Sequence, residues 1–360
     1  MRSINVVGLD IGGANTKISF LSVENGVIRT VKVMSQYFPV WKRKDELPFM
    51  LKRLKARINS LERVDSVGVT MTAELSDAYR TKKEGVDHIL ESVKEAFHDV
   101  KILVLDVEAN LLSPEEARRV HLKVASANWV ATGWMISKLL PNCIIIDVGS
   151  TTTSIIPVIN GKIAAEGKND LEKLINGELV YSGALRTNIA AIVNSVPIKG
   201  SMARVSSELF ATSGDVHLIL GNIREEDYVT ETADSRGKSR AEALARLARI
   251  ICADANMLNE GEIVEVARYI YERQIDQISC GLRQVYERIK SKLEPNFPVV
   301  VTGLGRNFLA CKAASAVGLK NIIDLGEVLG SEVALATPSV GVAVMVASKL
   351  QGGDIIWKMS

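Results

Sequence analysis

Two segments far apart in the chain share one pattern of apolar and polar positions. Residues 7–20 and residues 144–156 each contain an apolar strand that ends at an aspartate, a turn of small residues and a second strand. An Asn-Gly pair follows each segment, at Asn25-Gly26 and Asn160-Gly161, and is typical of a type I′ hairpin turn. The pattern therefore predicts a duplicated strand–turn–strand unit.

A third strand ends in a glycine-containing turn near the end of the chain. Residues 298–310 read as a buried strand, the turn Gly303-Leu304-Gly305 and a helix. Phe308 stands where a dinucleotide fingerprint would carry its third glycine, so this fingerprint is excluded. A Gly-x-Gly turn alone is equally typical of a tight strand-to-helix connection.

Helical spacing of apolar residues predicts four further segments, at residues 124–140, 240–256, 263–292 and 339–350. The last of these is expected to return to the N-terminal domain as a closing helix. The apolar residues of the second segment are expected to pack in a core: Leu244, Leu247, Ile251 and Met257.

Composition narrows the classes of protein but does not select one. The 360 residues are 47% hydrophobic and 24% charged, which favours two globular domains. Lys and Arg number 44 against 42 for Asp and Glu, so no excess charge favours nucleic acid or a membrane surface. The N-terminus lacks a signal-peptide pattern, and the apolar stretch 339–348 is shorter than the ~20 residues of a membrane span. We expect a cytoplasmic protein.

The cysteines and histidines show no spacing that indicates a metal or disulfide site. No C-x-x-C pair occurs, and we expect the cysteines to be small buried residues in a reducing compartment: Cys143, Cys252, Cys280 and Cys311. The four histidines are expected to be surface or packing residues: His88, His98, His121 and His217.

The duplicated unit carries the residue types that bind phosphate. Glycines let a backbone approach an anion closely, and an aspartate can hold Mg²⁺ or its water. Hydroxyls can donate to phosphate oxygens, and the two turns carry them at Thr16, Ser150, Thr151, Thr152 and Thr153. Two plain hairpins are the alternative, but a turn needs no acid, and here two copies carry Asp, Gly and Thr in register.

The three elements, in this order, resemble the actin, sugar kinase and Hsp70 superfamily. This resemblance implies an α/β fold of two duplicated ribonuclease-H-like domains with a ligand cleft between them. Residues 10–17 resemble the first phosphate loop, residues 147–153 the second, and residues 303–306 the nucleoside-side loop. The domains implied are 1–127 with 337–360, and 128–336.

The segment after strand 66–69 narrows the resemblance. It carries Thr72, Glu74, Asp77 and Arg80 at a strand end, where the superfamily's substrate would lie. A capped helix start, with Ser76 or Asp77 as the N-cap, is the alternative. Together with residues 10–17, this segment is similar to the hydantoinase and oxoprolinase-like branch, and more narrowly to archaeal methanofuran biosynthesis proteins. Residues 181–187, 210–216 and 232–238 add to this similarity.

The narrower resemblance implies a transferase that joins an aminomethyl-furanmethyl diphosphate to the phenol of gamma-glutamyltyramine. The product is an aryl ether, and diphosphate is released. Because furan is electron-rich, heterolysis at the furanmethyl carbon gives a stabilised cation. The main catalytic task is then to neutralise the departing diphosphate, which suits phosphate-binding loops.

Roles follow for the candidate residues. We assign Lys17 to the diphosphate charge, Asp10 and Asp147 to Mg²⁺ or its waters, and Glu74 or Asp77 to deprotonation of the phenol. Diphosphate contacts are assigned to Gly12, Gly13, Asn15, Thr16, Gly149, Ser150, Thr151 and Thr152. Further substrate contacts are assigned to Thr72, Arg80, Arg186, Gly303, Gly305 and Arg306. The basic residues Arg236, Lys238, Arg240, Arg246 and Arg249 either add diphosphate contacts or form a solvated helix face.

Other functions stay open at this point. An ATP-dependent small-molecule kinase or a hydantoinase-like hydrolase would use all three loops for a nucleotide. A non-enzymatic nucleotide switch is the other alternative. The expected partners are small-molecule substrates, without nucleic acid or membrane, and a homodimer is left open. The Asp-Asp-x-x-Asp pair of ordinary prenyl-diphosphate synthases is absent from the sequence.

Overall fold

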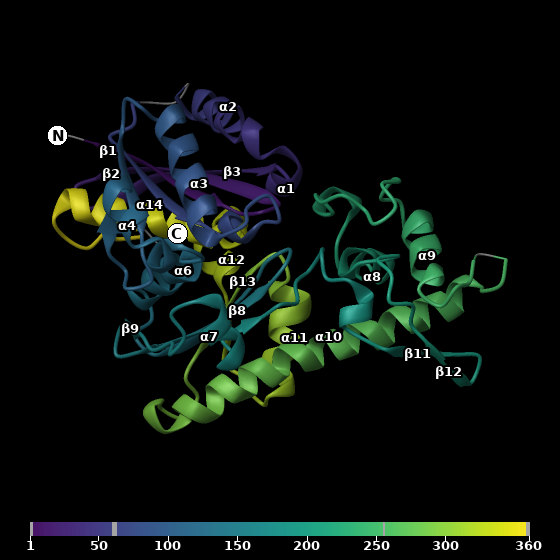
Figure 1. Cartoon of the computed structure of the whole chain (residues 1–360). Coiled ribbons are helices and arrows are strands. Elements are labelled where there is room, and N and C mark those ends of the chain that lie inside the picture. Colours follow the sequence, from purple (N-terminus) through teal and green to yellow (C-terminus); the bar gives the residue numbers. More distant parts are fainter. Residues whose placement is uncertain (1–2, 60–62, 255, 358–360) are drawn as a thin grey trace. The chain divides into compact units, whose positions relative to one another are not determined.

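A computed structural model describes residues 3–59, 63–254 and 256–357 of the chain (Figure 1). It contains two compact units. The first unit comprises Met1–Cys143, Ile156–Ile175 and Leu325–Ser360. The second comprises Ile144–Ile155 and Asn176–Asp324. The domain boundaries at residues 127 and 337 stay a prediction.

The first unit is built on a six-stranded sheet with the order β3-β2-β1-β4-β5-β6. β1 pairs antiparallel with β2 and parallel with β4, and β4 pairs parallel with β5. Asn25 and Gly26 connect β2 to β3 with positive φ at both positions, which confirms the predicted hairpin turn. The strands are β1 (Ile4–Ile11), β2 (Asn15–Glu24), β3 (Val27–Tyr37), β4 (Ser66–Met71), β5 (Lys101–Leu105) and β6 (Leu111–Leu112).

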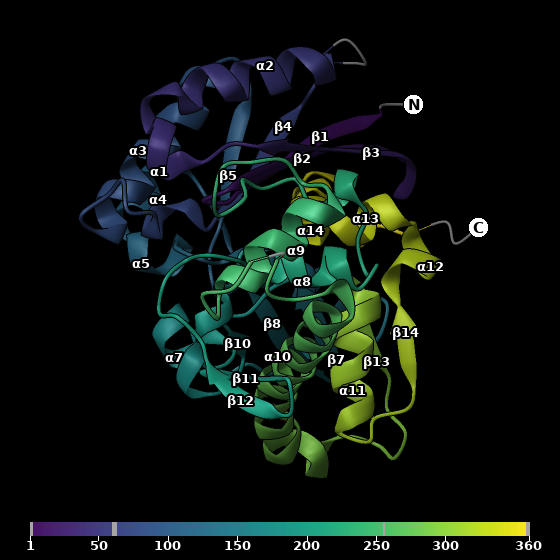
Figure 2. The same cartoon turned by 90° about the vertical axis from the view of Figure 1, so that its right-hand side faces the viewer.

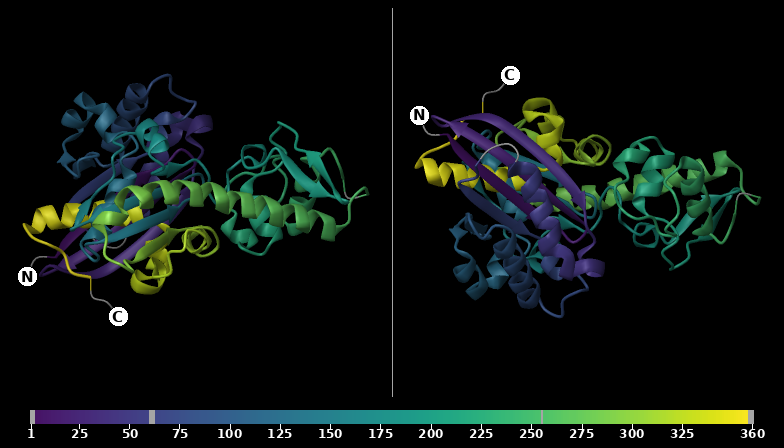
Figure 3. Two further views of the ribbon diagram at one scale, coloured as in Figure 1. Left: turned by 90° about the horizontal axis from the view of Figure 1, so that it is seen from below. Right: turned by 90° about the horizontal axis from the view of Figure 1, so that it is seen from above.

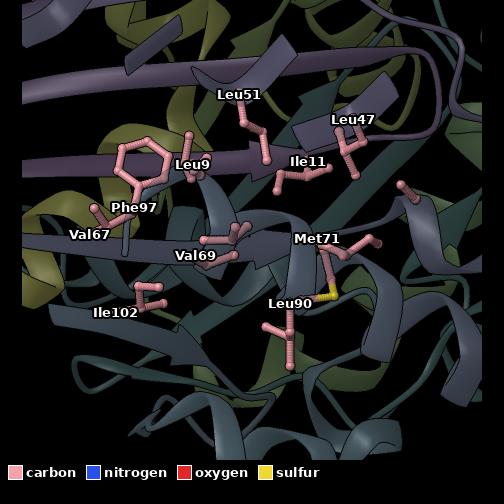
Figure 4. Packing of buried hydrophobic residues seen from close by; sticks show 14 of the residues in the cluster. Leu9, Ile11, Leu47, Leu51, Val67, Val69, Met71, Leu90, Phe97 and Ile102 are labelled. Atoms are coloured by element: carbon pink, nitrogen blue, oxygen red, sulfur yellow. The ribbon is translucent and has the colours of Figure 1, made fainter. Parts of the chain in front are cut away.

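One face of this sheet packs against two helices, α2 (Leu47–Asn59) and α3 (Lys82–Ala96). Figure 4 shows Leu9, Ile11 and Val69 of the sheet among buried side chains of this cluster. Burial of apolar side chains contributes about 25 cal/mol per Å², so this cluster stabilises the unit strongly. The shorter helices are α1 (Val40–Arg43), η1 (Lys44–Glu46), η2 (Ala73–Leu75), α4 (Pro114–Arg119) and α5 (His121–Val124).

The other face of the sheet packs against α14 (Thr337–Gln351), which confirms the predicted closing helix. Gly8 and Gly68 make this contact possible. A Cβ on Gly8 would lie 1.9 Å from the carbonyl oxygen of Ser339, and one on Gly68 would lie 2.8 Å from Val346. Further elements of this unit are α6 (Asn128–Ser137), which contacts α14, then β9 (Lys162–Ile163), α7 (Asp170–Ile175), α12 (Leu325–Leu329) and α13 (Ser331–Leu335).

The second sheet repeats the strand order of the first. Its order is β10-β8-β7-β13-β14, with β9 beside β8, and Figure 2 shows β10, β8, β7, β13 and β14 in turn. β7 pairs parallel with β13, and β13 with β14, as β1, β4 and β5 do in the first unit. The strands are β7 (Cys143–Val148), β8 (Thr153–Ile159), β10 (Leu179–Val180), β13 (Val299–Gly303) and β14 (Ile322–Asp324). This duplicated α/β order agrees with the predicted fold class.

A long helix, α10 (Glu260–Ile289), runs through the second unit and confirms the helix predicted over 263–292. Figure 3 shows a group of smaller elements near one end of α10. That group contains α8 (Ser213–Ile219), α9 (Arg240–Arg249), β11 (Ser195–Ile198) and β12 (Ser201–Arg204). The remaining elements are η3 (Ile189–Ala191), η4 (Glu225–Asp227), η5 (Lys290–Lys292), the π-helix η6 (Arg306–Ala310) and α11 (Cys311–Ala316).

Several local predictions were wrong. The segment 124–140 is not one helix, because a bend at Ser126, with φ of 54°, separates α5 from α6. Met257 is exposed, since α9 ends at Arg249 and Met257 lies in the following turn. Cys143 is buried, but the other three cysteines are exposed or half-buried on helices or in a turn. Within the described ranges, no helix combines the length and apolar character that crossing a membrane requires.

Candidate functional site

The first predicted phosphate loop is a tight turn whose backbone carbonyl groups accept hydrogen bonds from backbone amides. The Gly12 amide donates to the Asn15 carbonyl at 3.0 Å and closes the turn. The amides of Phe38 and Val40 donate to the carbonyls of Ala14 and Gly13 at 2.8 and 2.9 Å. Because a trans peptide directs its N–H opposite to its C=O, the amides of Ala14 and Asn15 point away from the segment 38–40.

The second predicted phosphate loop has the same turn. The Gly149 amide donates to the Thr152 carbonyl at 2.9 Å, as Gly12 does to Asn15. The amides of Leu185 and Arg186 both donate to the Ser150 carbonyl at 2.9 Å, and the Ala184 amide donates to the Gly149 carbonyl. The amides of Ser150 and Thr151 therefore point away from the segment 184–186. Pairs of backbone amides arranged in this way can bind an anion.

The residue before the segment 184–186 must be a glycine, because Gly183 packs closely against the second loop. A Cβ on Gly183 would lie 2.5 Å from the carbonyl carbon of Thr151 and 2.7 Å from the Thr152 amide nitrogen. The Arg186 guanidinium donates to the Thr151 hydroxyl at 3.3 Å. The structure thus places Arg186 against the second predicted phosphate loop.

Asp10 and Asp147 occupy the same place in the two units. Asp10 lies near the end of β1 opposite Thr70 of β4, and Asp147 lies near the end of β7 opposite Thr302 of β13. Lys17 on β2 is the register partner of Asp10, so both side chains lie on one face of the sheet. The two carboxylates are therefore placed by strand register, as the sequence pattern predicts.

Gly303 and Gly305 lie against β7 in the second unit. Gly303 has φ of +85°, and a Cβ there would lie 2.7 Å from Asp147 Oδ1 and 2.4 Å from the Val148 carbonyl oxygen. A Cβ on Gly305 would lie 2.4 Å from Val148 Cγ1. These glycines make room for Asp147 and its strand. Their predicted ligand contact stays a prediction.

Three buried polar atoms near the first loop have no hydrogen-bond partner within the described ranges. They are Asn15 Oδ1, Thr16 Oγ1 and Thr70 Oγ1. Buried polar atoms are rarely left unpaired, so these atoms are suited to bind a ligand or water. Thr72 lies beside Gly12 of the same loop, since its Oγ1 would be 3.5 Å from a Cβ on Gly12.

The side chains near Asp10 and Asp147 determine how a metal ion could be bound there. No group of three His, Cys, Asp or Glu side chains within the described part of the chain could hold a metal ion. Mg²⁺ commonly binds one or two carboxylates and takes its remaining ligands from water and phosphate oxygens. Single aspartates beside anion-binding turns fit that manner of binding.

Of the two candidate bases, Glu74 and Asp77, Glu74 is buried. It lies in η2 with 1% of its surface exposed, whereas Asp77 and Arg80 are exposed. Ser126 Oγ lies 2.7 Å from Glu74 Oε1. Burial raises the pKa of Glu74 to about 7. The alternative of a helix capped by Ser76 or Asp77 is wrong, because Thr81 caps α3.

Arg306 and the basic run of α9 are engaged in ion pairs. Arg306 Nε donates to Asp324 Oδ1 at 3.0 Å. Arg246 is fully buried and pairs with Asp215 at 2.8 Å, so a solvated helix face is wrong for this residue. Arg246 and Arg249 both pair with Asp234.

Sequence reasoning missed a polar network that supports the second loop. Gln274 Nε2 donates to Ser182 Oγ at 3.1 Å and to the Gly183 carbonyl at 2.9 Å. His217 Nε2 lies 2.9 Å from Gln274 Oε1, and burial lowers the pKa of His217 to about 3. Gln274 lies within a long helical pattern. The one feature of the sequence that could have indicated its role is a polar residue at a helix position that is otherwise apolar.

Comparisons with known proteins find a matching family and named relatives. A model of the hydantoinase/oxoprolinase family matches residues 65–349. The (4-{4-[2-(gamma-L-glutamylamino)ethyl]phenoxymethyl}furan-2-yl)methanamine synthase of Methanocaldococcus jannaschii is 40% identical over 348 residues, which cover 96% of this chain and 99% of the relative. The synthase of the same name from Methanococcus vannielii is 38% identical over 211 residues, covering 58% and 92%.

A solved structure shares the fold. The nucleotide-free structure of acetone carboxylase superposes with a TM-score of 0.55 at 10% identity, covering 96% of this chain and 70% of that chain. At this identity the likeness shows the fold alone. Together with the duplicated strand order, it confirms the predicted α/β fold class.

Proposed function

The chain belongs to the hydantoinase/oxoprolinase family, and from this premise we propose that it is a synthase that forms the furanmethyl aryl ether of methanofuran biosynthesis. The observation that carries this proposal is the 40% identity, over 96% of the chain, to a relative with that name. The two anion-binding turns add support from the structure, since a leaving diphosphate needs such groups.

The reaction joins a furanmethyl diphosphate to the phenol of gamma-glutamyltyramine. The phenol oxygen forms a bond to the furanmethyl carbon, and the bond from that carbon to the diphosphate oxygen breaks. The electron pair leaves with the diphosphate, and the phenol loses its proton. The enzyme must therefore stabilise the leaving negative charge and accept one proton.

We assign diphosphate contacts to the turn of each unit, taken by itself. The amides of Ala14 and Asn15 point to one side of the first turn, and those of Ser150 and Thr151 to one side of the second. Lys17 and Arg186 add positive charge beside these turns. In each unit the aspartate of the first strand, Asp10 or Asp147, would hold Mg²⁺ or its waters, and the ion when bound supplies charge neutralisation at phosphate oxygens.

Glu74 is our candidate for the base. A general base acts best when its pKa lies near the working pH, and burial raises the pKa of Glu74 to about 7. Its Oε2 atom is buried and has no hydrogen-bond partner within the described ranges. This oxygen can accept a proton from the phenol. A cytoplasmic location completes the proposal, and a homodimer stays open.

A mass-spectrometric assay tests this function. Purified protein is incubated with furanmethyl diphosphate, gamma-glutamyltyramine and Mg²⁺ in the absence of ATP. We expect ether and diphosphate in equal amounts from the native protein, and a loss of both with Asp10→Ala and with Lys17→Ala. Lys32→Ala, an exposed lysine of β3, is the matched control. Ether formation that requires ATP, or no ether at all, would contradict the proposal.

A further inference from the structure

One hydroxyl in the first unit lies between two carboxyl groups. Ser126 Oγ is 2.7 Å from Glu74 Oε1 and 2.7 Å from Asp170 Oδ2. A hydroxyl has one proton and can donate to only one of these oxygens. The second short contact therefore requires a proton on one of the two carboxyl groups.

The surroundings decide which carboxyl group holds this proton. Lys82 Nζ donates to Asp170 Oδ2 at 3.0 Å, so a negative charge on Asp170 has a partner. Glu74 is 1% exposed, and its Oε2 has no partner within the described ranges. An ionised carboxylate is costly in such a place, and burial raises the pKa of Glu74 to about 7. The proton belongs on Glu74, which donates to Ser126, which donates to Asp170.

The other ionisable groups nearby do not change the assignment of the proton to Glu74. Burial raises the pKa of Tyr79 above its ordinary value, so Tyr79 stays neutral. Lys173, on the same helix as Asp170, lies 4.4 Å from the ring centroid of Trp129. The charged groups that act on Glu74 are thus Lys82 on α3 and Asp170 on α7.

The backbone holds Ser126 in a conformation that serine rarely adopts. Its φ is 54°, and the preceding Ala125 forms a β-bridge with Met71 at the end of β4. Gly85 of α3 lies so close to Glu74 that a Cβ would be 2.5 Å from the Glu74 carbonyl oxygen. Such strain persists only where the surrounding structure enforces it, and it is frequent at functional sites.

We propose that Glu74, Ser126 and Asp170 form a proton relay that carries the phenol proton away from the reacting atoms. This inference rests on the proposed function. The phenol O–H bond breaks and its proton goes to Glu74 Oε2. The Glu74 proton passes from Oε1 to Ser126 Oγ, and the Ser126 proton passes to Asp170 Oδ2. Asp170, whose side chain is 21% exposed, then releases one proton to water.

Infrared spectroscopy tests the resting state of this relay without any substrate. At about pH 6, we expect a carbonyl band of a neutral carboxylic acid that disappears with Glu74→Gln and titrates near the Glu74 pKa of about 7. In Ser126→Ala the band should titrate at a different pH, because the hydrogen bond to Glu74 is lost. A band that persists in Glu74→Gln, or that does not move in Ser126→Ala, overturns the relay.

Kinetics test its role in turnover. Ser126→Ala and Asp170→Asn should each lower kcat about tenfold or more at unchanged KM, and should shift the acid limb of the pH profile. Ser126→Gly removes the same hydroxyl but relieves the backbone strain, so it should lose kcat while unfolding no more easily than the native protein. Lys83→Met, beside Lys82 on the outer face of α3, is the control and should keep native kcat.

The two proposals fail in different ways. If the infrared band behaves as expected but no ether forms, then the shared proton stands and the phenol as its source is wrong. If ether forms with native kcat in Ser126→Gly and in Asp170→Asn, the synthase stands and the relay is overturned.

Discussion

The two sheets place an aspartate and a tight turn alike, but the strand beside that aspartate is followed by different residues. In the first unit, Thr70 lies opposite Asp10, and Glu74 follows four residues later as a buried acid. In the second unit, Thr302 lies opposite Asp147, and Arg306 follows four residues later in an ion pair with Asp324. The duplicated scaffold thus keeps the aspartate and the turn in both copies, whereas the proposed proton acceptor lies in the first copy.

The largest expected effect tests what the copies share. Asp10→Asn and Asp147→Asn should each lower kcat/KM about 10³-fold, because each removes a charge that would hold Mg²⁺. Chelation of divalent ions should abolish turnover in the native protein, with recovery on addition of Mg²⁺. Diphosphate release is the measurement. A variant that keeps full activity would show that its loop is not used.

The next effect tests how the copies differ. Glu74→Gln should lower kcat about 10²-fold, because a general base is lost. Arg306→Gln should lower kcat less than about tenfold but should cost about 1–2 kcal/mol of stability, since it leaves the Asp324 carboxylate half-buried without its ion pair. Steady-state kinetics and urea unfolding separate the two outcomes. Equal losses of kcat in both variants would remove the distinction between the copies.

The pH dependence of stability should have opposite signs in the two units. Glu74 has a folded pKa of about 7 against 4.5 in the unfolded chain, so the folded unit binds more protons between these values. Stability should fall by about 3 kcal/mol as pH rises from about 5 to about 8, and Glu74→Gln should abolish this loss. Unfolding by urea at several pH values measures it, and an unchanged slope in the variant would refute the assignment.

His217 sets the opposite slope in the second unit. Its folded pKa is about 3 against 6.5 when unfolded, so the unfolded chain binds the extra proton. Stability from this group should be complete above about pH 6.5 and lost as pH falls towards about 3. Hydrogen exchange should therefore show the α8 and α10 amides losing protection in acid before those of β1 and β4. The reverse order would contradict a buried neutral His217.

The smallest expected effect concerns one turn position that both copies share. A Cβ on Gly12 would lie 2.7 Å from the Asn15 carbonyl oxygen, whereas one on Gly149 would lie 3.5 Å from that of Thr152. Gly12→Ala should therefore cost about 1–2 kcal/mol, and Gly149→Ala less than about 0.5 kcal/mol. Thermal unfolding gives both values. An equal loss of stability in the two variants would mean that the two turns differ less than their geometry indicates.

Local patterns explain which features the sequence could predict. The duplicated hairpins, the closing helix and the long helix α10 all appear as short-range periodicity or turn residues. The contact between Glu74 and Ser126 joins residues 52 positions apart, and that between Ser126 and Asp170 joins residues 44 positions apart. Neither pair has a local signature, because a serine before a helix normally indicates only a cap.

Charge at helical spacing was the main source of error in the second unit. Arg246 and its neighbours follow the periodicity of an exposed helix face, yet Arg246 is buried beside Asp215. A single sequence does not reveal which charged face finds an opposite charge on another element. Gly303 and Gly305 make room for Asp147 and Val148, and their predicted ligand contact stays a prediction.

The contact between α14 and Gly8 also bears on how the chain is made. A ribosome completes β1, β2, β4 and β5 long before it reaches α14, whose Ser339 carbonyl closes over Gly8. The nascent sheet therefore carries one uncovered apolar face through most of translation. Its folding can finish only after synthesis has passed this helix, and a chain stalled earlier would present that face to chaperones and proteases.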